Sequence, residues 1–279
     1  MTNKNIAKIL IIAGSDPCGG AGLQADIKTA TAHKVYCGAV VTCLTAQNTQ
    51  GVASVFNVPI KFLKAQLETV LDDIKFDVIK IGMLSNAEII DCVADVLLHK
   101  AKKIPLILDT VMVSTSGHRL LEKNAVSALK SRLLKGAFLA TPNIDEAEIL
   151  AQMPIKNLAD MKIAAIKIKA LGVKNVLIKG GHLPAKNSLI QNILLADKSC
   201  QANNTKAAGQ DTFFTISNKK IAIKNIHGTG CSLASAIACN IAKKIDLPKS
   251  VKKANNYVYK AVVNNLSVGK GSKVLQHFV

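Results

Sequence analysis

Short apolar runs alternate with longer segments of helical period, and this alternation constrains the fold more than any other feature of the sequence. A run of four to eight apolar residues is typical of a strand that is buried on both faces. Such strands, when helices separate them along the chain, form a mostly parallel sheet with helices on both sides. The predicted strands are Lys8–Ala13, Ala39–Leu44, Phe76–Ile81, Pro105–Asp109, Ala137–Ala140 and Asn175–Ile178.

Helices are predicted between these strands, because apolar residues recur there every three or four positions. The segments are Gly22–His33, Pro59–Ile74, Ala87–His99, Glu122–Leu134, Ile144–Ala151 and Leu158–Leu171. Two further helices, Cys231–Lys244 and Pro248–Leu266, are predicted near the end of the chain.

The segment between these two groups of helices has a different pattern. Leu189–Leu195 and Thr212–Ser217 are predicted strands separated by the polar stretch Lys198–Gln210, with no helix between them. We expect an antiparallel pair at a sheet edge or in a lid. No repeat or low-complexity linker divides the chain, so residues 1–279 are predicted to form a single α/β domain.

Composition excludes several classes of protein. The 279 residues are 49% hydrophobic and 19% charged, which excludes a disordered chain, and no apolar run reaches the length of a membrane span. The polar start Met1–Lys8 leads into a run too short for a signal peptide. Seven cysteines, odd in number and without a C-x-x-C pair, are typical of reduced thiols, so a cytoplasmic location is predicted.

The formal net charge of +18 raises the question of a nucleic-acid or membrane partner. Only Arg119 and Arg132 are arginines among the 36 cationic residues, so 34 are lysine, and they are scattered along the chain. Tryptophan is absent and aromatic residues are 4% of the chain, whereas nucleic-acid readers cluster arginine and stacking rings. We therefore predict a lysine-rich solvated surface, with no nucleic-acid partner and no membrane partner.

The segment His227-Gly-Thr-Gly-Cys231, just before a predicted helix, is the most informative local motif. Glycines let successive backbone N–H groups approach a ligand, and the positive end of the next helix favours an anion. The motif predicts a phosphate or oxyanion cradle; the alternative is a plain glycine turn at a helix start. At a helix N-terminus the thiol pKa of Cys231 is expected to be lowered, and the alternative is an inert packing residue.

Polar residues also follow other strands, where ligands of parallel sheets bind. Asp109, Asn143 and Glu146 offer oxygen atoms of the kind that hold hydrated Mg²⁺. The alternative for Asn143 and Glu146 is a capping box, which this spacing suits equally well. Gln47 offers a donor and an acceptor to a heterocycle edge. Neither of the two common glycine-rich nucleotide motifs, G-x-x-x-x-G-K-[ST] and G-x-G-x-x-G, occurs, so a nucleotide must be held in another way.

Taken together, these motifs resemble a known family. Their order and spacing, from about Ile9 to about Leu266, are similar to those of the hydroxymethylpyrimidine and phosphomethylpyrimidine kinases of thiamine biosynthesis, which have the ribokinase-like fold. The strings that carry the resemblance are AGSDPCGGAGLQADIKT, TCLTAQNTQGV, IKIGMLSNAEII, LDTVMVSTSG, TPNIDEAEIL, VLIKGGH and HGTGCSLASAIA.

The resemblance implies a three-layer α/β/α sandwich with a mostly parallel central sheet. It also implies an enzyme that uses ATP and Mg²⁺ to phosphorylate 4-amino-5-hydroxymethyl-2-methylpyrimidine and then the resulting monophosphate in the same site. The implied partners are this small-molecule substrate, ATP and a second copy of the chain in a homodimer.

Roles for individual residues follow from the resemblance. Gln47 would recognise the pyrimidine edge, and the residues around it would be Asp26, Gly14, Met83 and Val111. Cys231 would be the catalytic base. The anion hole would consist of Gly228, Thr229, Gly230 and Cys231, with Lys179 neutralising phosphate charge. Asn143 and Glu146 would hold Mg²⁺ largely through water, and Asp109 would support the metal or the phosphates.

The sequence departs from the family pattern at a few positions. Thr110 stands where proline is usual, Ile226 where threonine is common, and Asn255 where the last helix usually has a lysine; Lys253 is a candidate replacement for that lysine. The alternative activity is a pyridoxal or pyridoxine kinase, because some members with this G-T-G-C motif act on vitamin B6. A non-catalytic nucleotide-binding protein of the same fold is disfavoured by the presence of Cys231, Glu146 and Lys179.

Overall fold

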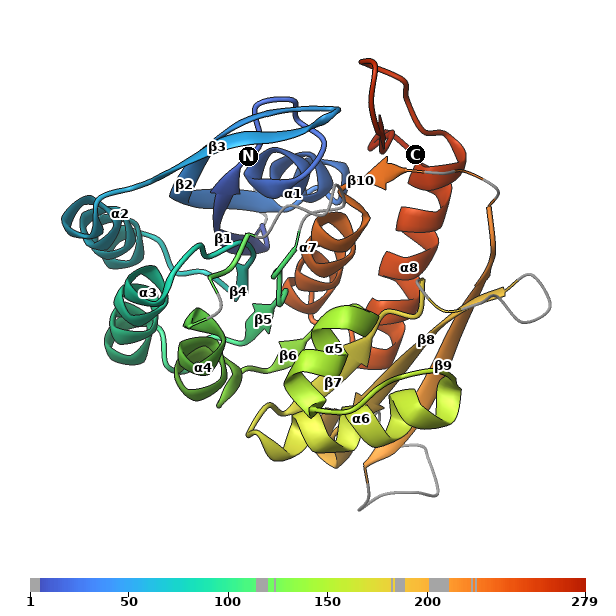
Figure 1. Ribbon diagram of the computed structural model, residues 1–279. Coiled ribbons are helices and arrows are strands. Elements are labelled where there is room, and N and C mark those ends of the chain that lie inside the picture. The colour runs from blue at the N-terminus through green and yellow to red at the C-terminus, as the bar shows by residue number, and fades with distance from the viewer. Residues whose placement is uncertain are drawn as a thin grey trace.

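Nine strands of the described chain form one central sheet in the order β3-β2-β1-β4-β5-β6-β7-β8-β9 (Figure 1). The structure is a computed structural model that describes residues 6–113, 120–122, 124–181, 183, 189–200, 211–221, 223 and 225–279. The strands are β1 (Lys8–Ser15), β2 (Tyr36–Asn48), β3 (Gly51–Asn57), β4 (Val78–Ile81), β5 (Leu106–Leu108), β6 (Leu139–Ala140), β7 (Asn175–Ile178), β8 (Leu189–Ala196) and β9 (Thr212–Lys219).

In the order of the sheet, the neighbours β2, β1, β4, β5, β6 and β7 pair in parallel. Strand β3 pairs antiparallel with β2, β8 pairs antiparallel with β7, and β9 pairs antiparallel with β8. A separate parallel pair is formed by β10 (Ile226–His227) and β11 (Lys273–Val274). The sheet is therefore mostly parallel, with an antiparallel pair at one edge, as the sequence predicts.

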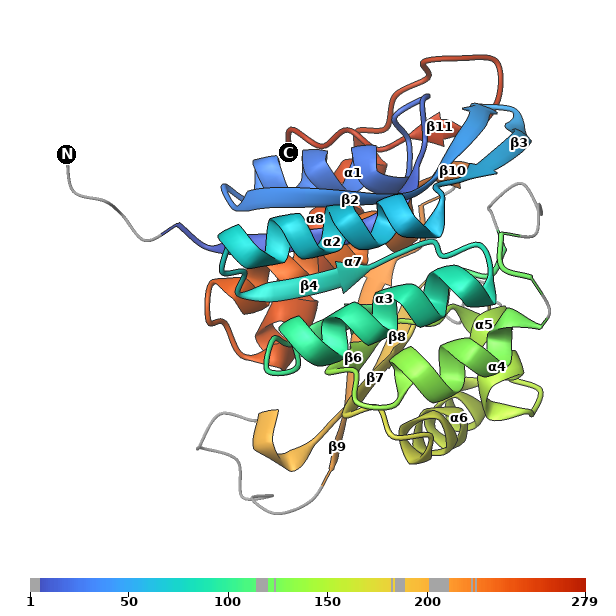
Figure 2. The same cartoon turned by 90° about the vertical axis from the view of Figure 1, so that its left-hand side faces the viewer.

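Helices cover both faces of the sheet, which gives three layers (Figures 1 and 2). One face packs against α2 (Ile60–Asp73), α3 (Ala87–Lys100), α4 (Ala125–Ala128), α5 (Ile144–Ala151) and α6 (Leu158–Ala170). The other packs against α1 (Gly22–Ala32), α7 (Thr229–Ala242) and α8 (Leu247–Val263). No helix of the described residues is long and apolar enough to cross a membrane.

The predicted elements are confirmed with small shifts at their ends, and three features differ. The helix expected over Glu122–Leu134 begins at Ala125 and ends in a π-helical turn, Leu129–Leu134. Strand β3 was not predicted, nor was the pair β10–β11. Three parts of the predicted segments lie outside the described residues: residue 182 of the VLIKGGH string, residues 114–117 of LDTVMVSTSG and residues 201–210 of the polar stretch.

The unpredicted strand β3 is the second arm of a hairpin with β2. Strand β2 runs on to Asn48, four residues beyond the predicted Leu44, and its Asn48 Oδ1 accepts hydrogen bonds from the backbone N–H groups of Gln50 and Gly51, at 2.8 and 3.3 Å. An asparagine followed closely by glycine is a turn signal. This signal at Asn48 and Gly51 was the one that could have revealed the hairpin.

A buried ion pair links three elements beneath the carboxyl ends of the strands. Lys80 of β4 is fully buried, and its Nζ lies 2.8 Å from Asp26 Oδ2 on α1. Ser235 of α7 donates to the other carboxylate oxygen, Asp26 Oδ1, at 2.7 Å. Burial lowers the pKa of Lys80, but the Asp26 carboxylate outweighs this and raises it, so the Lys80 ammonium keeps its charge.

We predict that Lys80→Met lowers the free energy of unfolding by about 3–5 kcal/mol, because it leaves a buried carboxylate without its partner. The double variant Lys80→Met with Asp26→Leu should recover much of this loss. Lys64→Met is the control, since Lys64 pairs with Glu68 on an exposed helix face at 3.9 Å and should change stability little. Urea denaturation measures all three variants, and a Lys80→Met protein as stable as wild type would contradict the prediction.

Candidate active site

A cavity of about 800 Å³ opens along the carboxyl ends of the parallel strands. Its walls come from the ends of β1, β2, β4, β5 and β7, from β8 and β9, and from the starts of α5 and α7. The residues expected at the site that line it are Gly14, Gln47, Met83, Asp109, Val111, Asn143, Glu146, Lys179, Gly228, Thr229, Gly230 and Cys231. The fold therefore gathers into one space residues that lie far apart in the sequence.

Asp26 is the exception, and its expected place around the substrate is wrong for this structure. It is fully buried and is not among the residues that line the cavity. Its carboxylate is taken up by Lys80 and Ser235, and Lys80 is the member of this group that lines the cavity. Asp26 is thus linked by this ion pair to a cavity residue, Lys80, to which the sequence analysis gave no role.

The glycine motif before α7 packs closely against the loop that follows β1. Gly228 has a left-handed backbone with a φ of 84°, and a Cβ there would collide with the carbonyl oxygen of Gly20. A Cβ on Gly230 would lie 3.3 Å from Lys179 Nζ and 3.8 Å from Asp109 Oδ2. The first backbone N–H groups of α7 have no partner within the helix, so they suit an anion next to Lys179.

The Cys231 thiol at this helix start differs from its expected state. Burial is the largest cause that raises its pKa, Lys80 opposes it and the carboxylates of Asp26 and Asp109 add to it, and the result is a pKa of about 12. The backbone of Gly22 also hydrogen-bonds the thiol and lowers its pKa. The expected lowering by the helix N-terminus is therefore wrong for the ligand-free protein, because desolvation outweighs it. The thiol is protonated in this state.

Lys179 and Asp109, which both line the cavity, form an ion pair. Lys179 Nζ lies 2.9 Å from Asp109 Oδ1, which also accepts a hydrogen bond from Thr141 Oγ1 at 3.0 Å. Burial raises the pKa of Asp109, but the cations Lys179 and Lys80 outweigh it and hold that pKa below its ordinary value. The carboxylate and the ammonium are both charged and neutralise each other in the ligand-free site.

Asn143 and Glu146 form the capping box of α5 that the sequence allowed as an alternative. Asn143 Oδ1 accepts from the Glu146 backbone N–H, and Glu146 Oε2 accepts from the Asn143 backbone N–H, both at 2.9 Å. Thr110 donates to Glu146 Oε2 at 3.0 Å, a hydrogen bond that proline at this position would lack. Burial raises the pKa of Glu146 to about 7, with Asp109 adding to the effect and Lys179 opposing it.

The oxygen atoms of this region suit the role that the resemblance implies for them. Asp109 and Glu146 are carboxylates that line one cavity, and Mg²⁺ is commonly held by one or two carboxylates together with water and substrate phosphates. The Asn143 oxygen is already used by the helix cap. Glu146 Oε2 is used by the same cap and by Thr110, so the fit is to a hydrated ion held by Asp109 and contacted through water by Glu146 and Asn143.

The remaining departures from the family pattern have visible surroundings. Asn255 lines the cavity and accepts a hydrogen bond from Asn192 Nδ2 at 3.0 Å through its Oδ1. Lys253 is exposed and lies two residues away on α8, so it points to another side of the helix and does not replace the missing lysine. Ile226 forms part of β10, where it pairs with Lys273.

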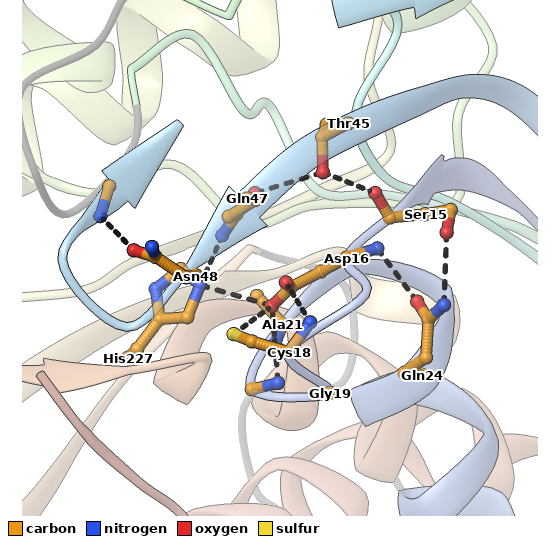
Figure 3. Close-up of polar contacts among 12 residues, drawn as sticks. Ser15, Asp16, Cys18, Gly19, Ala21, Gln24, Thr45, Gln47, Asn48 and His227 are labelled. Carbon is orange, nitrogen blue, oxygen red and sulfur yellow. Dashed lines mark hydrogen bonds and ion pairs between the residues drawn. The ribbon is translucent and has the colours of Figure 1, made fainter. Parts of the chain in front are cut away.

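A polar cluster that the sequence did not assign surrounds Asp16, the residue after β1 (Figure 3). Its buried carboxylate accepts the backbone N–H groups of Cys18, Gly20 and Ala21 at 3.0, 3.1 and 2.8 Å, and His227 Nε2 lies 3.3 Å away. Burial raises the pKa of Asp16, but the hydrogen bonds from His227, Cys18 and the loop outweigh it and lower that pKa. In the sequence, the signal for this cluster was an aspartate, Asp16, followed closely by the glycines Gly19 and Gly20.

The chain matches the phosphomethylpyrimidine kinase family over residues 16–276. It belongs to that family. It is 40% identical over 276 residues to the hydroxymethylpyrimidine/phosphomethylpyrimidine kinase of Haemophilus influenzae, a match that covers 98% of this chain and 97% of its relative. The family places this chain among the kinases, which are phosphotransferases.

Solved structures agree with the fold. A phosphomethylpyrimidine kinase from Clostridium difficile is 37% identical with a TM-score of 0.76, over 92% of this chain and 99% of that one. A Staphylococcus aureus pyridoxal kinase in complex with AMP-PCP and pyridoxal is 28% identical with a TM-score of 0.82, over 98% and 94%. The ribokinase-like fold is therefore confirmed, while the homodimer and the cytoplasmic location stay predictions.

We predict a pH-dependent loss of stability that comes from Glu146. Its pKa in the folded chain, about 7, lies above the ordinary value of 4.5, so folding binds the proton more tightly. The stability that protonated Glu146 contributes is full below about pH 4.5 and is lost as the pH rises through 7. The free energy of unfolding of wild type, relative to Glu146→Gln, should therefore fall between these values.

Denaturant unfolding without Mg²⁺ at a series of pH values measures this difference. Glu88→Gln is the control, because Glu88 is exposed in the first turn of α3, and the same comparison should stay flat across the range. A difference between wild type and Glu146→Gln that does not change with pH would show that the carboxyl titrates normally.

Proposed function

We propose that this chain transfers the γ-phosphoryl group of ATP to the hydroxymethyl group of 4-amino-5-hydroxymethyl-2-methylpyrimidine, and then phosphorylates the monophosphate to give the diphosphate used for thiamine diphosphate. One observation carries the proposal. Gln47, which suits a heterocycle edge, shares a cavity with a helix-start anion cradle and with the charged groups Lys179 and Asp109. The family and its named relatives point to the same reaction.

The sheet order separates the two ends of the reaction. Gln47 on β2 and Gly14 on β1 lie towards one end of the sheet, with Met83 just after the neighbouring β4, whereas β8 and β9 line the opposite end of the same cavity. Lys179, Gly230 and Cys231 lie between them. The pyrimidine belongs at the Gln47 end and the nucleotide at the other, so that the hydroxymethyl group and the γ-phosphate meet at the anion cradle.

Charge compensation is the main task of the central groups. Lys179 moves from Asp109 towards phosphate oxygens, and the N–H groups at the start of α7 stabilise the charge of the transferred group. Asp109 and Glu146 would hold Mg²⁺, which supplies positive charge to the phosphates when it is bound.

Cys231 is proposed to accept the proton of the attacking hydroxyl. The hydroxyl oxygen forms a bond to the γ-phosphorus, the bond from that phosphorus to the bridging oxygen of ADP breaks, and the proton passes to Sγ. The thiol must first release its own proton to water, and Lys80 is the cation that lowers its pKa. Because phosphoryl transfer has a loose transition state, the proton is needed late and a modest base is sufficient.

A second candidate substrate is pyridoxal or a related pyridine alcohol. It is favoured by the likeness to the Staphylococcus aureus pyridoxal kinase, although the curated relative of higher identity acts on the pyrimidine by name. The two ligands differ at the edge that Gln47 reads, because the pyrimidine places an amino group beside a ring nitrogen.

We predict that the purified protein with Mg²⁺ and ATP converts the hydroxymethylpyrimidine to its mono- and then diphosphate, with a higher kcat/KM than for pyridoxal. ADP release coupled to NADH oxidation, with product identification by mass spectrometry, measures both reactions side by side. Turnover of pyridoxal alone would assign the chain to the second candidate, and absence of all products from folded protein would remove both.

We predict that Cys231→Ala lowers kcat roughly 10²–10⁴-fold, the usual contribution of a positioned base, while AMP-PCP and pyrimidine still bind. Cys92→Ala is the control, since Cys92 lies on α3, away from the cavity, and should leave kcat near wild type. A Cys231→Ala enzyme with near wild-type kcat would mean that the anion cradle and the metal suffice and that Cys231 is a packing residue.

A further inference from the structure

The carboxamide of Gln47 lies between two fixed groups (Figure 3). Its Oε1 is placed 3.2 Å from Thr45 Oγ1 and its Nε2 is placed 2.9 Å from His227 Nε2. The nitrogen and oxygen ends of a carboxamide have nearly the same shape, so their hydrogen-bond partners decide which end faces which neighbour. The orientation of the amide therefore follows from which of the partner atoms donate a proton to it and which accept one.

The Thr45 hydroxyl has a single hydrogen, and it is already used. Thr45 Oγ1 lies 2.8 Å from the backbone carbonyl oxygen of Ser15, which can only accept. Towards Gln47 the Thr45 oxygen is then left with lone pairs, so it can only accept there as well. The end of the amide that suits this contact is the NH₂ group.

The His227 ring leads to the same answer from the other side. Its Nε2 lies 3.3 Å from the Asp16 carboxylate as well as 2.9 Å from the Gln47 amide. Asp16 is a buried carboxylate whose pKa is lowered, so it is ionised and favours a proton on Nε2. A protonated Nε2 cannot face an NH₂ group, but it can donate to Asp16 and to an amide oxygen at once.

Four contacts have to be satisfied: Thr45 with Ser15, Thr45 with Gln47, Gln47 with His227, and His227 with Asp16. With the NH₂ of Gln47 towards His227, two of these four contacts lack a proton or a lone pair. With the amide turned by 180°, all four are satisfied: Thr45 donates to Ser15, Gln47 donates to Thr45, and Nε2–H of His227 is shared by Asp16 and Gln47. Each end of the amide also keeps one free position, a hydrogen on nitrogen and a lone pair on oxygen, for a ligand.

The His227 ring is held from several sides. Its backbone pairs with Val274 in the β10–β11 ladder, and its side chain is only 13% exposed. A Cβ on Gly20 would lie 2.9 Å from His227 Cδ2, so the loop backbone lies close against the edge of the ring. Asp16 is held in turn by three backbone N–H groups. The imidazole is thus held in a fixed position next to the Gln47 amide.

We propose that His227, held by Asp16, is a positioning residue that locks the Gln47 amide with its oxygen towards the imidazole, and thereby sets which order of donor and acceptor the site reads. The proposal rests on the proposed function, in which Gln47 contacts the pyrimidine. A ring nitrogen beside an amino group matches the locked amide. A ring N–H beside a carbonyl, as in the 4-oxo analogue, presents the reverse order and is rejected.

The test compares kcat/KM for the 4-amino substrate and its 4-oxo analogue. Wild type should favour the amino compound roughly 10- to 100-fold, the usual discrimination of a bidentate contact. His227→Leu, which frees the amide to turn, should lose most of this ratio through KM, whereas His227→Gln, which can place an N–H near the same position, should retain it. AMP-PCP affinity serves as the control for general damage to the site.

The outcomes separate the inference from the proposed function. Wild type that phosphorylates the pyrimidine, together with a His227→Leu ratio equal to the wild-type ratio, would overturn the lock while leaving the function intact. Wild type without turnover would remove the function, and the lock is then decided by a measurement that needs no activity.

That measurement is ¹⁵N NMR of histidine-labelled wild-type protein without ligand, with the His227 signals identified by their loss in His227→Gln. We expect Nε2 of His227 to carry the proton. An unprotonated Nε2 would turn the amide the other way and overturn the proposal, whether or not the His227→Leu variant folds.

Discussion

The two halves of the site depend on the contacts that the buried Asp16 carboxylate makes. It captures three backbone N–H groups of the loop after β1 and so shapes the glycine-rich segment against which Gly228 packs. It also contacts His227, the residue just before the anion cradle. One buried charge therefore links the Gln47 end of the cavity to the start of α7, so the proposed positions of pyrimidine and phosphate are set relative to each other by groups that are already fixed.

The ligand-free cavity holds its charges in compensated form. Lys80 pairs with Asp26 and Lys179 pairs with Asp109, while burial keeps Glu146 partly protonated and the Cys231 thiol neutral. Unpaired charges would be costly in such a space. In the proposed reaction, a phosphate and a cation that enter together would exchange these internal partners for ligand partners. The raised thiol pKa is then a property of the resting site, and the proposed proton acceptance by Cys231 depends on the charges around it once ligands bind.

The sequence predicted the layers and most of the expected residues that line the cavity, because hydrophobic period and strand-end position are local properties. It could not predict that Asp26 is buried outside the cavity lining, since that depends on Lys80 and Ser235, which contact it from two other elements. The state of Cys231 was missed for a related reason: the helix start is visible in the sequence, whereas desolvation is set by the whole fold. The hairpin strand β3 was missed because its alternation is weak.

The most direct test of the account is a crystal structure of the protein with hydroxymethylpyrimidine and AMP-PCP bound together. We expect the pyrimidine edge on Gln47, the hydroxymethyl oxygen between Cys231 and the γ-phosphate, and that phosphate on the N–H groups of Gly228–Cys231. A pyrimidine bound elsewhere, or a γ-phosphate remote from the start of α7, would contradict the claim that this single cavity brings the two reacting groups together.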